Sequence, residues 1–317
     1  MPAERRCQAA LRRTVNLTAR VETALDRKVD PAIAAFAARL GKEAQAIAVL
    51  FYGSNLRTGS LEGVLDFYVL TDGPPERGIW PRVSYREWEH EGETLRAKIA
   101  TMTLAKFAYA ARGASRDSTI WARFVQPSAL VWCCEGGDER SGLPYRTAIV
   151  DVIEDAVRIA SELAVALGPQ SGRENDFWRA LFRQTYKAEL RFEKPGRENS
   201  ILELNAAHFA GLLPAALESA GIPYSGTGDL LVPVMPAARR RQVFRSWRRS
   251  RRWGKPLNIA RLLRATRTFD GAGRYAAWKV ERHTGVKVEV TPWREKHPVL
   301  AAPGVLWKVW RAKRRAD

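Results

Sequence analysis

Apolar runs of six to eight residues, bounded by polar and turn-forming residues, occur four times in the first half of the chain. Residues 46–52 form the first run, which ends at Gly53, as expected of a buried strand followed by a turn. The others cover residues 64–70, 95–102 and 129–134, and the segment 104–111 has helical spacing. Helical spacing within residues 9–40 also predicts one or two helices ahead of the first strand.

The second half of the chain has a different pattern. A turn-rich stretch, 135–144, precedes helical patterns over residues 148–167 and 177–191. We therefore predict an α+β fold in which a mixed sheet with helices, residues 1–140, is followed by a mainly helical unit, residues 145–255. Residues 256–317 are basic and aromatic and form the predicted membrane-associating C-terminal region.

Composition places the chain among folded proteins with polyanionic partners. Its 317 residues are 46% hydrophobic, enough for one large core or two modest ones. Against 34 Asp and Glu stand 52 Lys and Arg, and a net charge of +18 favours nucleotides, nucleic acid or an anionic membrane surface as partners. Three cysteines, two of them adjacent, predict a reducing compartment rather than a disulfide framework.

Membrane contact is expected to be peripheral. No apolar segment follows the N-terminal arginines as a secretory signal requires, and the longest charge-free apolar stretch, 204–217, is too short to span a bilayer. The Ala- and Arg-rich composition indicates a bacterial source, so we expect a cytoplasmic protein at the inner face of the cytoplasmic membrane.

One segment concentrates positive charge. Residues 239–255 hold nine cations and no Asp or Glu, which indicates a surface for anions or anionic lipid. Two tryptophans in it are expected to act as interfacial anchors. The predicted surface comprises Arg245, Trp247, Arg248, Arg249, Arg251, Arg252 and Trp253. Residues 305–315 repeat this mixture of aromatic and cationic side chains.

The chemistry is predicted at the end of the first strand. Nucleotidyl transfer requires backbone that can approach a triphosphate and a carboxylate that can hold magnesium. Tyr52, Gly53 and Ser54 meet the first requirement, because glycine has no Cβ to block the phosphates. Asp66 meets the second, and strand alternation places it on the same face as Tyr68.

This arrangement resembles the polymerase-beta-like nucleotidyltransferase superfamily, in which a second carboxylate stands two residues after the first. Tyr68 occupies that position here. A Gly-Ser turn followed by a strand with a single aspartate resembles the motif of one branch of the superfamily. That branch is the mitochondrial translocator assembly and maintenance family of CTP:phosphatidate cytidylyltransferases. Residues 95–100 resemble that family's Lys-containing strand, with Lys98 as the matching cation. Residues 120–127 resemble its Gly-Arg-Leu to Lys-Pro segment: Arg123 and Pro127 match, whereas Ala122 and Gln126 depart.

The resemblance implies a reaction and a set of roles. CTP and phosphatidic acid, or a similar lipid phosphate, would give CDP-diacylglycerol and pyrophosphate, with Mg²⁺ as cofactor. Tyr52, Gly53 and Ser54 would bind the nucleotide, and Asp66 would hold the metal. Lys98 and Arg123 would neutralise phosphate charge. Because a lipid phosphate is already ionised at neutral pH, positioning and charge neutralisation can carry such a reaction.

Other interpretations remain open at this point. Glu89, Glu91 and Glu93 precede the Lys98 strand and are candidates for a second metal ligand by proximity alone. The chain could instead transfer nucleotides to RNA or protein, or be a non-catalytic adaptor for membranes or nucleic acid on a degenerate nucleotidyltransferase fold. His208 lies in an apolar helical stretch, which favours a hydrogen-bonded core histidine over a catalytic base.

Overall fold

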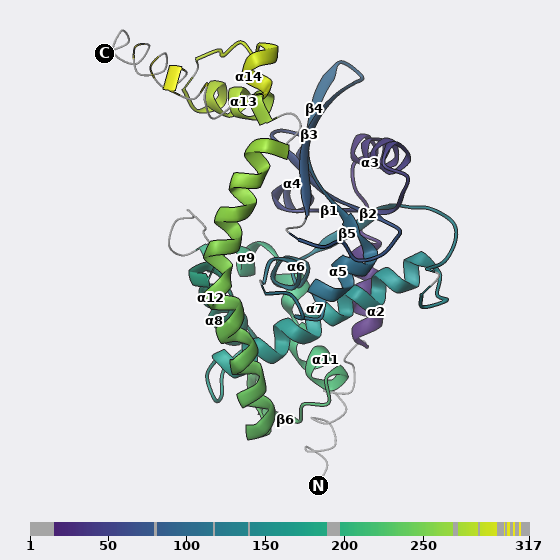
Figure 1. Cartoon of the computed structure of the whole chain (residues 1–317). Helices are drawn as coiled ribbons and strands as arrows, with labels where there is room; N and C mark the ends of the chain where they lie inside the picture. The colour runs from purple at the N-terminus through teal and green to yellow at the C-terminus, as the bar shows by residue number, and fades with distance from the viewer. Residues whose placement is uncertain are drawn as a thin grey trace.

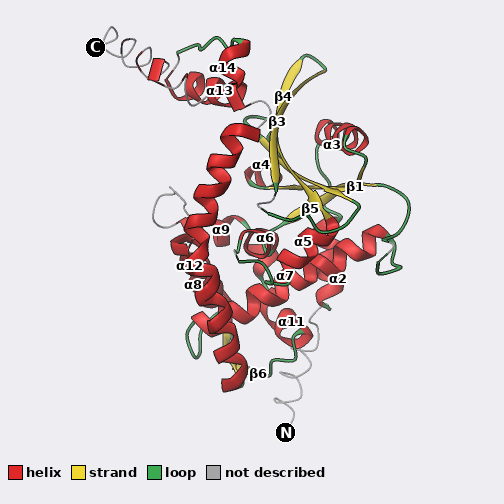
Figure 2. Cartoon of the chain, in the orientation of Figure 1, coloured by secondary structure: helices red, strands yellow, loops and turns green. Residues whose placement is uncertain are grey.

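The computed structural model describes residues 16–78, 81–116, 118–138, 140–188, 197–268, 272–284 and 286–296, and the single residues 301, 303, 304, 307 and 311. Figure 1 shows the path of the chain, and Figure 2 shows its strands gathered beside a larger body of helices. The first elements are α2 (Leu17–Leu25), α3 (Pro31–Glu43), β1 (Ala46–Tyr52), α4 (Ser54–Thr58), β2 (Leu65–Thr71), β3 (Arg82–His90), β4 (Glu93–Thr103), α5 (Leu104–Ala111), α6 (Thr119–Phe124) and β5 (Ser128–Cys133). They confirm the predicted strands to within two residues at either end.

The remaining elements are mostly helical, as predicted. They are α7 (Tyr145–Leu167), α8 (Glu174–Ala188), α9 (Arg197–Leu204), α10 (Ala206–Phe209), α11 (Leu212–Ser219), β6 (Tyr224–Thr227), β7 (Leu230–Pro233), α12 (Ala237–Thr268), α13 (Ala272–Thr284) and α14 (Pro292–Lys296). Of the C-terminal segment 305–315, the structure describes only Trp307 and Arg311, so the interfacial character expected there lies almost wholly outside the described residues.

A mixed five-stranded sheet confirms the α+β prediction. Its order is β3-β4-β2-β1-β5; β2 and β4 are parallel, and the other neighbours are antiparallel. Strand β3 was not predicted, because its charged and apolar residues alternate without a continuous apolar run. It lies at the sheet edge, and the β3–β4 hairpin extends past the other strands (Figure 1).

Alternation along the strands gives the sheet two buried faces. One carries Val49, Phe51 and Phe67 and packs on α3, whose N-terminus is capped by the Asp30 carboxylate accepting from Ala32 N at 2.8 Å. Gly41 of α3 permits close contact with β5, since a Cβ there would lie 2.5 Å from the Trp132 ring. The other face packs on α2, α5, α6 and α7.

The second face belongs to a core that continues into the helical half. Leu50 and Tyr68 of the sheet share one buried cluster with residues of α7, α8, α11 and α12. Helix α12 runs through residue 256 without a break, so the predicted limit at 255/256 falls inside a helix. The division of the chain into separate domains therefore stays a prediction.

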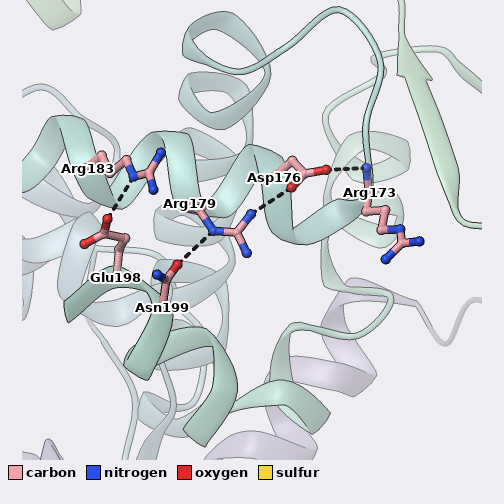
Figure 3. A network of polar contacts seen from close by, with 6 residues as sticks. All are labelled: Arg173, Asp176, Arg179, Arg183, Glu198 and Asn199. Atoms are coloured by element: carbon pink, nitrogen blue, oxygen red, sulfur yellow. Dashed lines mark hydrogen bonds and ion pairs between the residues drawn. The ribbon is translucent and has the colours of Figure 1, made fainter. Parts of the chain in front are cut away.

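Polar contacts join α8 to α9 (Figure 3). Arg183 Nε donates to the buried Glu198 carboxylate at 2.8 Å, and Arg179 Nε donates to Asn199 Oδ1 at 2.9 Å. The Asp176 carboxylate accepts hydrogen bonds from Arg179 Nη1 at 2.7 Å and from the backbone N–H of Arg173 at 3.0 Å. The bonds of Arg183 and Arg179 to Glu198 and Asn199 hold the short helix α9 against α8.

Trp247 corrects the predicted membrane surface. It is 4% exposed, and its ring lies 6.4 Å from that of Trp121 in α6, so it belongs to the core that joins α12 to the rest of the protein. Trp253 is 40% exposed, with the Arg116 guanidinium 5.2 Å from its ring centre. Of the two predicted anchors, only Trp253 is accessible.

This difference predicts contrasting stabilities. Trp247→Ala should lower the free energy of unfolding by about 3–5 kcal/mol, because it empties a packed site. Trp253→Ala should change it by less than about 0.5 kcal/mol. Urea unfolding followed by circular dichroism measures both, and equal effects would contradict the burial of Trp247.

Candidate active site

The turn after β1 brings backbone close to a carboxylate. Gly53 has φ 94° and ψ −159°, a conformation essentially restricted to glycine. A Cβ at Gly53 would lie 3.0 Å from Asp66 Oδ2. Ser54 follows at the start of α4 and is exposed. The residues predicted to bind nucleotide therefore pass directly beside Asp66.

Asn55 holds the loop between α4 and β2, a role that the sequence interpretation missed. It is buried, and its Nδ2 donates to the backbone oxygens of Ser60 and Glu62, both at 2.8 Å. The Asn directly after Gly-Ser could have indicated this role, because buried side-chain amides usually form hydrogen bonds with the backbone. These two bonds close the loop that leads to Asp66.

The sheet register brings Lys98 next to Asp66. Asp66 pairs with Tyr52 of β1 on one side and with Lys98 of β4 on the other, so the three side chains share one face. Neighbouring strands lie about 4.8 Å apart. Burial raises the pKa of Asp66, and the charges of Lys98 and Arg123 lower it in part. The carboxylate thus lies within electrostatic range of two cations.

Arg123 reaches this row from α6. Its Nη1 donates to the Tyr68 hydroxyl at 3.0 Å, and its guanidinium lies 5.1 Å from the centre of the Tyr52 ring and 5.8 Å from that of Tyr68. Both rings are buried, and burial raises the pKa of Tyr52 well above its ordinary value. The structure brings Tyr52, Gly53, Asp66, Lys98 and Arg123 together, with Ser54 next along the chain; their roles stay a prediction.

The three glutamates suggested as second metal ligands lie elsewhere. Glu89, Glu91 and Glu93 occupy the tip of the β3–β4 hairpin, and Glu93 precedes Lys98 by five residues of strand. At about 3.3 Å per residue this is roughly 17 Å along β4. Proximity in the sequence was misleading, because residues only a few positions apart in an extended strand are already far apart in space.

One carboxylate fits a magnesium ion that arrives with a nucleotide. Within the described part of the chain, no group of three or more His, Cys, Asp or Glu side chains converges as a preformed metal site would require. Mg²⁺ keeps several waters and binds to one or two carboxylates together with substrate phosphates. Asp66 can therefore supply the protein's share of such a site, with triphosphate oxygens supplying the rest.

A hollow of about 750 Å³ opens at the same end of the sheet. Its walls include the loop 59–63, which leads to Asp66, and residues 93–96 of β4, which end two residues before Lys98. Asp66, Lys98 and Arg123 are not among the residues that line it. Helix α13 closes one side with Trp278, whose ring centre lies 5.9 Å from the Arg96 guanidinium and 5.2 Å from that of Arg282. The volume is within the range of small-molecule sites.

Helix α12 presents a one-sided cationic surface. Seven exposed cations lie within an arc of roughly 160° of the helix: Arg241, Arg245, Arg248, Arg249, Arg251, Arg252 and Lys255. Val243, Trp247, Ser250 and Gly254 form the buried opposite side. We call the seven exposed residues the α12 cationic stripe. It contains every arginine of the predicted surface.

The structure also bears on His208 and on possible membrane-spanning segments. His208 Nε2 lies 2.9 Å from the Val125 carbonyl oxygen, and burial lowers the pKa of His208 to about 4, as expected of a neutral core histidine. Among the described residues no single helix has the length and hydropathy to cross a bilayer, although Glu198–Leu204 and Ala206–Ser219, bent by 84°, pass that test as a pair.

Comparison with known proteins leaves the site as the basis for interpretation. No model of a known protein family matches the chain, and no curated protein is significantly similar to it in sequence.

Proposed function

We propose that the protein is a magnesium-dependent nucleotidyltransferase that transfers CMP from CTP to phosphatidic acid or a similar lipid phosphate. The observation that carries this proposal is the grouping of Asp66 with its cross-strand neighbour Lys98 and with Arg123, beside the glycine turn that ends β1. Two cations and one carboxylate suit a triphosphate that arrives with its metal. The choice of CTP and of phosphatidic acid comes from the family resemblance.

Residues of the site described above have distinct roles in the proposed reaction. An oxygen of the lipid phosphate attacks the α-phosphorus; the new P–O bond forms as the bond to the bridging oxygen breaks, and pyrophosphate leaves. Lys98 and Arg123 stabilise the charge on the transferred and leaving phosphates. Gly53 lets the phosphates approach the backbone. Asp66 would hold the magnesium ion that arrives with the nucleotide, and that ion would supply Lewis-acid activation and orientation.

The α12 cationic stripe supports an acceptor that resides in a membrane. Each Lys or Arg near an anionic lipid surface contributes about 1 kcal/mol of attraction, so half of the stripe would hold the protein there. Trp253 and Ile259 of α12, 40% and 46% exposed, are large apolar residues accessible to such an interface. Peripheral binding to the cytoplasmic membrane would bring the site to its lipid substrate.

A labelling experiment tests the reaction. Purified protein is incubated with Mg²⁺ and labelled CTP, ATP, GTP or UTP in detergent micelles, with and without phosphatidic acid. We expect label in the organic phase from CTP only, and only when phosphatidic acid is present. Folded protein that labels no lipid from any nucleotide would refute the lipid acceptor.

A charge-reversal experiment tests the membrane surface. Replacing Arg245, Arg248 and Arg252 by Glu should abolish co-sedimentation with vesicles of phosphatidylglycerol, and wild-type protein should not bind pure phosphatidylcholine. The matched control replaces Arg27, Lys28 and Lys42, which are exposed on α3 and the loop before it. This control changes net charge equally and should retain binding. Equal loss of vesicle binding in both variants would indicate a non-specific charge effect. If the wild-type protein bound RNA tightly, with a steep dependence on salt, and did not bind vesicles, a nucleic-acid partner would be favoured.

A further inference from the structure

The residue two positions after Asp66 has an unexpected partner. Tyr68 stands where the resembled superfamily has its second carboxylate, and it is fully buried on the same face as Asp66. Phe107 and Phe124 pack against its ring, with centroid distances of 5.9 and 5.1 Å. Its hydroxyl accepts a hydrogen bond from Arg123 Nη1 at 3.0 Å. In the resembled superfamily this position binds a metal cation, whereas in this protein Tyr68 binds the cationic side chain of Arg123.

Several contacts restrict the orientation of Arg123. The hydroxyl of Tyr68 fixes one nitrogen, and the rings of Tyr52 and Tyr68 lie within 6 Å of the guanidinium carbon. Tyr52 and Tyr68 in turn pack on each other with ring centres 5.4 Å apart. Because both tyrosines are strand residues in the core, the guanidinium is supported by rigid elements. Arg123 remains partly exposed, so it is accessible to a ligand.

The charge balance of the site differs from that of a two-carboxylate site. Asp66, Lys98 and Arg123 together carry a formal charge of +1, if each is ionised. A second carboxylate at position 68 would lower this sum to zero, so the triphosphate would be attracted only after metal ions had bound. A net positive site can attract the triphosphate before any metal is bound.

We propose that Tyr68 is a positioning residue that fixes Arg123, and that Arg123 binds a phosphate oxygen of the nucleotide in place of a second metal ion. The inference rests on the proposed nucleotidyltransferase function and deepens it: the site uses one metal ion, and it binds the triphosphate group even without that ion. A planar guanidinium suits this role, since it can donate two parallel hydrogen bonds to a phosphate.

Metal-free nucleotide binding tests the role of Arg123. Titration calorimetry with CTP in EDTA should give a measurable affinity for the full chain, within about tenfold of that in Mg²⁺. Arg123→Gln should weaken the EDTA affinity at least about thirtyfold, and Arg123→Lys, which keeps the charge but loses the planar fork, about tenfold. Folded wild-type protein that binds CTP only with Mg²⁺ would overturn the proposal.

Tyr68→Phe isolates the positioning hydroxyl while keeping the packed ring. It should weaken CTP binding in EDTA about tenfold, the value of one hydrogen bond to a charged group. Tyr85→Phe is the matched control, because Tyr85 is equally buried and its hydroxyl donates to Glu87 at 2.8 Å rather than accepting from Arg123. If Tyr68→Phe and Tyr85→Phe bind CTP alike, Tyr68 does not position Arg123; if Tyr68→Phe is unfolded, Arg123→Lys tests the same contact from its other side.

The number of metal ions provides an independent readout. Electron paramagnetic resonance of Mn²⁺ titrated into the protein with a non-hydrolysable CTP analogue should give one bound ion per complex, and two would overturn the proposal. None of these measurements needs a lipid. Retained nucleotide binding with no lipid labelling would therefore reject the acceptor and leave the role of Arg123 standing.

Discussion

Asp66→Asn is expected to abolish nucleotidyl transfer while leaving the protein at least as stable as the wild type. Activity should fall by about a thousandfold or more, because the amide cannot replace the carboxylate as a magnesium ligand. Stability should not fall, because burial makes the charged form of Asp66 unfavourable despite Lys98 and Arg123. Loss of activity with a gain in stability is the expected mark of a residue kept for function.

The dependence on pH follows from the direction of the shift. The pKa of Asp66 is raised in the folded protein, so ionising this group costs stability as the pH rises from the unfolded pKa through the folded one. Above the folded pKa the penalty is constant. Asp66→Asn should therefore melt at a higher temperature than wild type at pH 7.5, and the difference should vanish at pH values where Asp66 is protonated in both states. A variant that is less stable than wild type at pH 7.5 would assign Asp66 a structural role.

Alternation along one strand was enough to predict part of the site. The sequence Leu65-Asp66-Phe67-Tyr68 placed the two polar residues on one face, and the structure agrees. The neighbour of Asp66 could not be predicted in the same way. Lys98 reaches it through parallel pairing of β2 with β4, and that pairing depends on the hairpin formed with β3.

Strand β3 shows why the sheet could be predicted only in part. Its residues Arg82, Glu87 and Glu89 are exposed at the sheet edge, where charged residues protect against pairing with other chains. Such a strand has no continuous apolar run to reveal it. Because β3 was not predicted, the three glutamates were expected close to Lys98, whereas the hairpin places them at its tip, away from Lys98.

The two tryptophans of α12 show a similar limit. Trp247 and Trp253 both lie among arginines and look alike in composition. Six residues correspond to roughly 240° around a helix, so the two side chains point in different directions. Which side is buried depends on α6 and α7, far away in the sequence. The contact between Tyr68 and Arg123, 55 residues apart, is beyond sequence patterns for the same reason.

Gly53→Ala is expected to remove activity at a modest cost in stability. The backbone conformation of Gly53 is one that other residues rarely adopt, and forcing Ala into it costs about 1–3 kcal/mol. The new methyl group would also lie 3.0 Å from Asp66 Oδ2, so the carboxylate or the turn must move. Because a displacement of about 1 Å at a catalytic group can cost a hundredfold in rate, we expect at least that loss in CMP transfer.

Gly59→Ala separates backbone strain from chemistry at the other end of α4. Gly59 also has a positive φ, 69°, but nothing lies within 4 Å of the position its Cβ would take. Its substitution should cost about 1 kcal/mol of stability and leave transfer within about threefold of wild type. Steady-state kinetics and thermal melts of the two variants provide the comparison. Equal loss of activity would mean that loop strain alone inactivates the enzyme, whereas loss only in Gly53→Ala would show that the reaction depends on close approach of this turn to Asp66.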